Sequence, residues 1–154
     1  MRGYYFALAA AACTGTALGV GLLSRTAQAQ NDPVYVVKDG LVDQKVFNGY
    51  RRYGDSCHRC HGPDGVGSSY APDLTESLKH MSQTDFNEVV INGRQNVTQS
   101  QQNVMPSFGH VEDVALYIND IYAYLKARSD GALGRGRRRP ATQADHDALY
   151  GVAP

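Results

Sequence analysis

The chain lacks an excess of charge of either sign, has few cysteines and contains no internal repeat. Its 154 residues include fifteen Lys and Arg against fifteen Asp and Glu. Such a balance leaves no electrostatic footprint for a general nucleic-acid-binding protein. The length allows one small domain with extensions. Residues 32–134 carry nine basic and thirteen acidic side chains, and residues 135–154 carry four basic and two acidic. A mildly acidic body therefore precedes a basic tail.

The N-terminal segment is apolar but diluted by Ala, Gly and Thr. A positive start at Met1-Arg2 and the small-x-small pattern Ala27-Gln28-Ala29 are typical of a secretory signal. We predict that residues 1–29 are a cleavable signal, cut before Gln30. The alternative is an uncleaved membrane anchor, because the apolar stretch is nearly long enough to span a bilayer. Cys13 lies inside this segment and is expected to be lost with it.

The mature chain then keeps two cysteines, and both lie in the run Cys57-His58-Arg59-Cys60-His61. A disulfide between them would close a very short loop. Because the stabilisation by a disulfide grows with the length of the loop, this one would contribute little. The pair therefore requires another explanation.

The rest of the chain indicates a few helices joined by long loops. Apolar residues recur at helical spacing from Leu41 to Tyr53, and Gly54 is expected to end that helix. Ser82 and Asp85 form a capping-box start for the next one. The predicted segments are an extended lead-in over 30–40, helices over 41–53, 83–92 and 113–127, loops over 62–74 and 94–109, and a basic, disordered tail over 131–154.

These elements predict an all-α domain over residues 41–130 with three to four helices. Three or four helices in a domain of this size form only a small hydrophobic core. The domain is better explained if its helices pack around a large apolar group.

Cys-x-x-Cys-His is the attachment motif of a c-type haem. The two thiols add to the two vinyl groups on one edge of the porphyrin, and the histidine offers its imidazole to the iron. A redox dithiol of thioredoxin type follows a buried strand, and no strand pattern precedes Cys57. A zinc site would draw on the histidines, and none of them is paired at finger spacing: His58, His61, His80, His110 and His146. The motif favours haem.

These residues resemble the class I c-type cytochromes. The matching positions are Gly49, Tyr53, Cys57, Cys60, His61, Pro72, Leu74, Met105 and the stretch Ala123-Tyr124-Leu125-Lys126. The resemblance covers about residues 41–129 and implies an all-α class I cytochrome c fold around one covalently attached haem c. In that family a glycine at the position of Gly49 lets the N-terminal and C-terminal helices cross closely. Tyr53 and Tyr124 match the aromatic positions at this crossing.

The resemblance also implies the ligands of the iron. His61 would be the proximal ligand, with its second ring nitrogen held by the carbonyl of Pro72. Leu74 would form the haem wall on that side. Met105 is expected to be the opposite ligand, because it lies in an irregular loop that Pro106 stiffens. His110 and Met81 are the alternatives, and an open site is a further one.

Arg94 and several charged residues in and after the motif have other expected roles. Arg94 either pairs with a haem propionate, since guanidinium and carboxylate match as a fork, or is a solvated arginine at a helix end. The side chains of His58 and Arg59 are expected to face solvent. The run from Arg135 to Arg139 is expected to be a solvated tail rather than a docking surface.

A haem iron with histidine and methionine ligands has both axial positions filled, and methionine raises its reduction potential. Such a site does not readily bind oxygen or peroxide. The predicted function is therefore one-electron transfer and not catalysis. The competing class is a haem enzyme or gas sensor, which needs an open or labile sixth position.

A closer resemblance suggests the electron donor. Gly49 to Tyr53, the stretch CHGPDGVGSSYAP, Asn103 to Pro106 and Asp120 to Arg128 resemble cytochromes that accompany periplasmic quinoprotein alcohol dehydrogenases, including the methanol-metabolism group. The resemblance implies a monomeric periplasmic carrier. It would take electrons from a dehydrogenase containing pyrroloquinoline quinone (PQQ) and pass them to a downstream cytochrome or oxidase. A general periplasmic carrier is the alternative. Arg51, Arg52 and Arg59 are candidate docking residues.

Overall fold

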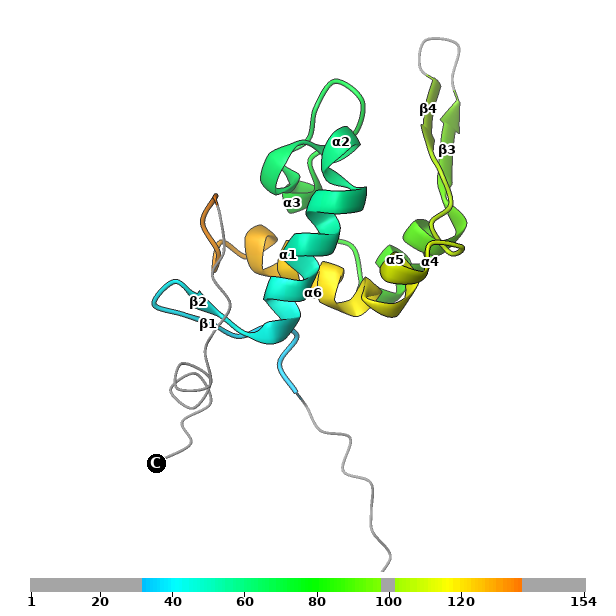
Figure 1. Cartoon of the computed structure of the whole chain (residues 1–154). Helices are drawn as coiled ribbons and strands as arrows, with labels where there is room; N and C mark the ends of the chain where they lie inside the picture. The colour runs from blue at the N-terminus through cyan, green and yellow to red at the C-terminus, as the bar shows by residue number, and fades with distance from the viewer. Residues whose placement is uncertain (1–31, 98–101, 137–154) are drawn as a thin grey trace, which may run out of the picture. The chain divides into compact units, whose positions relative to one another are not determined.

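The computed structural model describes residues 32–97 and 102–136 (Figure 1). The helices are α1 (Gln44–Ser56), α2 (His58–His61), the short 3₁₀ helix η1 (Pro63–Gly65), α3 (Leu74–Ser77), α4 (Gln83–Asn92), α5 (Glu112–Leu116) and α6 (Ile118–Ser129). The strands are β1 (Val37–Lys38), β2 (Leu41–Val42), β3 (Arg94–Val97) and β4 (Gln102–Met105). The predicted signal over 1–29 and the predicted tail beyond residue 136 lie outside the described residues. The described helices include none that is long and apolar enough to cross a bilayer.

Helix α1 begins later and ends later than predicted. Leu41 and Val42 belong to β2, which pairs antiparallel with β1. Asp43 then caps the helix by accepting a hydrogen bond from the backbone N–H of Val46 at 2.8 Å. Gly54 does not end α1, which continues to Ser56. Gly54 lies on the exposed face of the helix. The packing of the buried face stabilises the helix by more than the glycine costs in helix propensity.

Helices α1 and α6 cross each other at the centre of the molecule (Figure 1). A Cβ atom added to Gly49 would lie 1.9 Å from the carbonyl oxygen of Asp120 on α6. The rings of Tyr53 and Tyr124 pack against each other at the same crossing, tilted by 50° and with centroids 5.6 Å apart. The predicted roles of Gly49 and of the two tyrosines in this crossing are therefore confirmed.

We expect Gly49→Ala to lower the free energy of unfolding of the haem-loaded protein by about 3 kcal/mol, at the upper end of ordinary overpacking. The reason is that the new methyl group meets backbone atoms, which have no rotamer through which to escape. Gly54→Ala on the same helix is the matched control, because a Cβ there meets nothing within 4 Å. Urea unfolding of both variants measures the difference. Equal stability of the two variants would show that the helices do not cross this closely.

The last helix is interrupted, whereas the sequence predicts one continuous helix over 113–127. Tyr117 separates α5 from α6 with φ −110° and ψ 18°. The guanidinium carbon of Arg52 lies 3.8 Å from the centre of the Tyr117 ring, and the same guanidinium pairs with Asp113 at 3.2 Å. These contacts hold the break at Tyr117 against α1. The sequence around Tyr117 contains no proline or glycine from which the break could be predicted.

Helix α4 agrees with the prediction at both ends. The hydroxyl oxygen of Ser82 accepts a hydrogen bond from the backbone N–H of Asp85 at 3.2 Å, and the helix ends at Gly93. Phe86 and Val90 are buried on its inner face. The ring of Phe86 packs against that of Tyr122 on α6, with centroids 5.4 Å apart.

Residues 94–97 and 102–105 form a pair of strands where the sequence predicts an irregular loop. Strands β3 and β4 pair antiparallel with Arg94 opposite Met105 and Val97 opposite Gln102. Figure 1 shows the hairpin projecting from the end of α4, beside α5. Met105 is thus the last residue of a strand, and its backbone is held by pairing and not by Pro106 alone.

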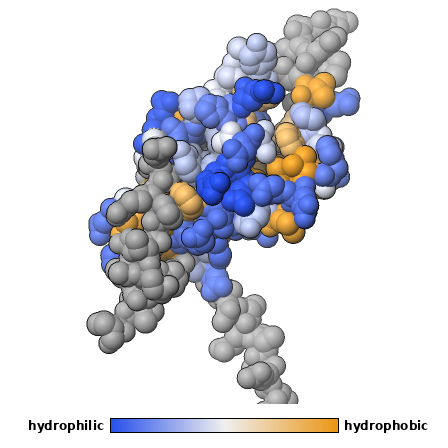
Figure 2. Space-filling view, viewed as in Figure 1, coloured by the Kyte–Doolittle hydropathy of each residue, from blue (hydrophilic) through white to orange (hydrophobic). Residues whose placement is uncertain are grey.

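The hydrophobic core lies between α1, α4, α5 and α6. Its most buried members include Val46, Tyr53, Phe86, Val90, Val114, Ile121, Tyr124 and Leu125. The face shown in Figure 2 is mostly hydrophilic, and hydrophobic residues gather over α4, α5 and the hairpin. That end of the molecule also carries one wall of the candidate site.

Candidate haem site

One cavity brings together most of the residues that the sequence singled out. The side chains that can attach or ligate a haem are Cys57, Cys60, His61 and Met105. The walls come from α3, α4, α6, the hairpin and the loop before α3, and they include Leu74, Phe86, Val89, Val90, Val104, Phe108 and Leu125. Two thiols, an imidazole and a thioether therefore share a largely apolar space. This donor set fits a covalently bound haem and its iron.

His61 is held in one orientation by the backbone. Its side chain is 7 % exposed, and its Nδ1 lies 3.0 Å from the carbonyl oxygen of Pro72. Because a carbonyl oxygen only accepts, the proton must be on Nδ1, and Nε2 then keeps its lone pair for a metal. The contact that the family resemblance implies between His61 and Pro72 is present. Leu74 lines the cavity beside them.

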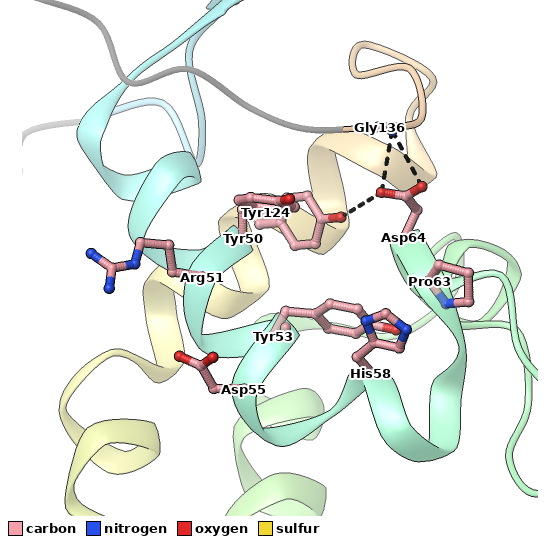
Figure 3. Close-up of a pocket in the computed structure, with 10 residues that line it drawn as sticks. Tyr50, Arg51, Tyr53, Asp55, His58, Pro63, Asp64, Tyr124 and Gly136 are labelled. Atoms are coloured by element: carbon pink, nitrogen blue, oxygen red, sulfur yellow. Dashed lines mark hydrogen bonds between the residues drawn. The ribbon is translucent and has the colours of Figure 1, made fainter.

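Two tyrosines at the crossing of α1 and α6 donate hydrogen bonds to the turn after His61. The hydroxyl of Tyr53 donates to the carbonyl of Gly62 at 2.5 Å, and that of Tyr124 donates to a carboxylate oxygen of Asp64 at 3.3 Å (Figure 3). Burial raises the pKa of both phenols, so both stay protonated as donors. The sequence identified these tyrosines as core residues. Their hydrogen bonds to this turn could not be predicted from the sequence, because they depend on where the turn packs against the two helices.

The surroundings of the Cys57 thiol favour its protonated form. Burial, and secondly the neighbouring Cys60, raise its pKa to about 12. Redox dithiols of the Cys-x-x-Cys type instead have a lowered pKa, which supplies the nucleophilic thiolate. Both thiols are free, with Cys57 partly buried and Cys60 exposed. The site therefore differs from a dithiol oxidoreductase. The described residues contain no cluster of three His, Cys, Asp or Glu side chains that would suit a metal ion.

Arg94 and Met105 are directly opposed across the hairpin. Opposed residues of an antiparallel pair project to the same face of the sheet, and both of these residues line the cavity. Met81 lines it as well, whereas His110 is exposed and is not among its lining residues. Met105 and Met81 are thus the two methionines that line the cavity, and His110 does not line it.

The arginines near the motif lie away from this cavity. Arg51 lines a second cavity of about 410 Å³, together with three tyrosines and the Asp64 turn (Figure 3). The side chain of Arg52 is 16 % exposed and is committed to Asp113 and Tyr117. Arg59 and His58 are exposed, as predicted. Arg135 lies 3.6 Å from a carboxylate oxygen of Asp64, so the first arginine of the basic run is paired rather than merely solvated.

Comparison with known proteins settles the family. Residues 44–125, more than half of the chain, match the family model described as cytochrome c oxidase, cbb3-type, subunit III. Cytochrome c-555 of Methylococcus capsulatus is 43 % identical over 96 residues, which are 62 % of this chain and 72 % of that protein. The chain belongs to the c-type cytochromes.

Two further relatives of this cytochrome support the assignment. Cytochrome c-553I of Paracoccus denitrificans is 49 % identical over 118 residues, which are 76 % of this chain. The chain spans about half of the Paracoccus protein's length, 51 %. The crystal structure of the c-type cytochrome XoxG from Methylobacterium extorquens AM1 matches with a TM-score of 0.59 and 41 % identity, over 72 % of this chain and 69 % of that one. The predicted class I cytochrome c fold is confirmed, and it includes two short hairpins that the prediction lacked.

Proposed function

We propose that this cytochrome is a periplasmic one-electron carrier with a single haem c attached through Cys57 and Cys60. His61 and Met105 are its axial ligands. The observation that carries the proposal is the shared cavity, in which both thiols, a histidine with its Nε2 free and a methionine meet among apolar walls. A haem bound there supplies reversible one-electron chemistry.

The residues around the haem control what the iron can do. His61 is fixed by Pro72, so its ring does not need to turn when the charge of the iron changes. Met105 would hold the iron from the other side, and its thioether, a weak donor, would favour the reduced state. Arg94, beside it, offers a guanidinium for a propionate. With both axial positions filled, the protein carries electrons and does not transform a substrate.

The proposed electron donor is a periplasmic PQQ-dependent alcohol dehydrogenase, one that oxidises methanol or another short alcohol. The support is the resemblance of the motif stretch and of the α6 sequence to cytochromes that accompany such enzymes. The similarity to XoxG and to cytochrome c-555 agrees with it. The proposed acceptor is a downstream cytochrome or terminal oxidase. A general carrier that serves several donors is the second candidate.

Partner docking is proposed at the mouth of the haem cavity, through apolar side chains. Tyr70 is 76 % exposed and Val104 is 59 % exposed, and both line that cavity. Redox partners meet through small and transient contacts, for which two apolar side chains beside the haem edge are suited. The docking role considered for Arg52 is withdrawn, because its guanidinium is engaged with Asp113 and Tyr117.

The proposal is tested by mixing the oxidised cytochrome with the purified dehydrogenase of the same organism and its alcohol, then following haem reduction. We expect the second-order rate constant of the Tyr70→Ser, Val104→Ser double variant to fall about tenfold, as for the loss of roughly 1.4 kcal/mol of contact energy. Leu116→Ser is the matched control, since Leu116 is 71 % exposed on α5 and does not line the cavity. We expect the control to keep the wild-type rate. Reduction no faster than that of an unrelated cytochrome c would remove the specific donor and leave the general carrier.

A further inference from the structure

The segment after Met105 is bound to the end of α4. The backbone N–H of Phe108 donates to the carbonyl of Val90 at 3.0 Å, and that of Gly109 donates to the carbonyl of Ile91 at 3.2 Å. The hydroxyl of Ser107 donates to the same Ile91 carbonyl at 2.5 Å. The last turn of a helix leaves carbonyl groups without helical partners, and these three bonds occupy two of them. The base of the hairpin is therefore closed across the end of α4.

Gly93 sits at the centre of this closure. A Cβ atom there would lie 2.7 Å from the carbonyl oxygen of Met105, 2.8 Å from the backbone nitrogen of Ser107 and 3.0 Å from the carbonyl carbon of Pro106. All three are backbone atoms, so no rotamer change would relieve the contact. The missing side chain of Gly93 is what allows the Met105 backbone to approach α4 this closely.

We propose that Gly93 is a positioning residue for Met105, one that sets how far the thioether reaches into the haem cavity. This inference rests on the proposed ligation of the iron by Met105. A side chain at position 93 would push the end of β4 away from α4. Because Met105 is the last residue of that strand, its sulfur would then withdraw from the iron. The glycine thus supports the strength of the sixth ligand without touching the haem.

The test compares Gly93→Ala with Gly131→Ala in the haem-loaded protein. Both glycines have a positive φ, +77° and +75°, so alanine is strained at either position, and the ψ of 176° at Gly93 adds to the strain there. A Cβ at Gly131 meets nothing within 4 Å, so this variant has the strain without the collision. Three quantities are measured on each: the far-red methionine-to-iron absorption, the reduction potential, and the affinity of the ferric protein for added imidazole.

We expect Gly93→Ala to weaken the far-red absorption, lower the potential, and bind imidazole at least about tenfold more tightly than the wild type. Gly131→Ala should keep all three wild-type values even if its stability falls. Wild-type values in Gly93→Ala would overturn the proposal.

If Gly93→Ala does not mature, Ser107→Ala decides, because it removes one of the three bonds between the segment and α4. A tighter imidazole affinity than the wild type is the expected result, and an unchanged one would overturn the proposal. Failure of Met105 ligation itself has a different signature. In that case the wild type lacks the far-red absorption, or Met105→Ala retains it.

Discussion

The double replacement of Cys57 and Cys60 by Ala is expected to abolish covalent haem attachment and to leave a chain that does not hold its native fold. The two thiols line the cavity beside His61, so their loss removes both proposed bonds to the porphyrin edge. The cavity is also bounded by side chains that belong to the core or pack against it, among them Leu74, Phe86 and Leu125. Without the haem these side chains would face water or collapse inward, and a small domain has little other core to compensate.

Acidified acetone measures the outcome directly, since covalent haem stays with the polypeptide and free haem is extracted. The wild type should keep its colour and give a c-type pyridine haemochrome spectrum, and the double variant should give neither. His58→Ala is the matched control, because His58 lies between the two cysteines and is exposed. Extraction of haem from the wild type, or colour retained by the double variant, would refute covalent attachment.

Replacing Met105 by Ala is expected to lower the reduction potential by on the order of 100 mV, because axial ligands shift haem potentials over a range of about 0.8 V. The same change should open the iron to carbon monoxide and imidazole. Met105 lies opposite Arg94 in the strand pair and lines the cavity, so the truncation leaves a gap in the cavity wall. Protein-film voltammetry and far-red absorption measure both effects.

Met81→Ala is the matched control for this experiment. Met81 lines the same cavity and immediately precedes the Ser82 cap of α4, and its side chain packs against the core. We expect this variant to be less stable yet to keep the wild-type potential and absorption. If Met81→Ala loses the far-red absorption while Met105→Ala retains it, the assignment of the sixth ligand is reversed.

The sequence predicted those elements whose signals are local or whose spacing is fixed by covalent chemistry. The Ser82 cap and the Gly93 stop define α4 from its own residues. The attachment motif places Cys60 and His61 in the short helix α2 and Cys57 at its N-cap, because all three lie within five consecutive residues. The family resemblance placed Gly49 at the helix crossing and Pro72 beside His61, and the structure has both contacts.

The missed elements depend on pairing and packing between distant residues. Strands β3 and β4 mix Arg, Gln and Asn with Val97, Val104 and Met105 and show no regular apolar alternation, so the sequence did not announce their pairing. The break at Tyr117 is held by Arg52 from another helix. One missed feature did carry a signal. Asp39-Gly40 is a two-residue hairpin turn, and both residues have positive φ as that turn requires.

Sequence reasoning missed the residues that support the proposed ligands. Tyr53 and Tyr124 hydrogen-bond to the turn after His61. Gly93, which has no side chain, lets the Met105 backbone lie close to the end of α4. Each support acts between segments that only the fold brings together. The position of a glycine or tyrosine in the sequence does not show which distant backbone segment it will contact in the folded protein.

The central claim is that both axial positions of the iron are filled, which makes this cytochrome a carrier and not a haem enzyme or gas sensor. Exposure of the reduced wild-type protein to carbon monoxide at neutral pH tests the claim most directly. We expect no change in the Soret absorption, while Met105→Ala under the same gas should show the shift of a carbon monoxide complex. Formation of that complex by the wild type would contradict the account, because an iron that accepts the gas has an open or labile sixth position.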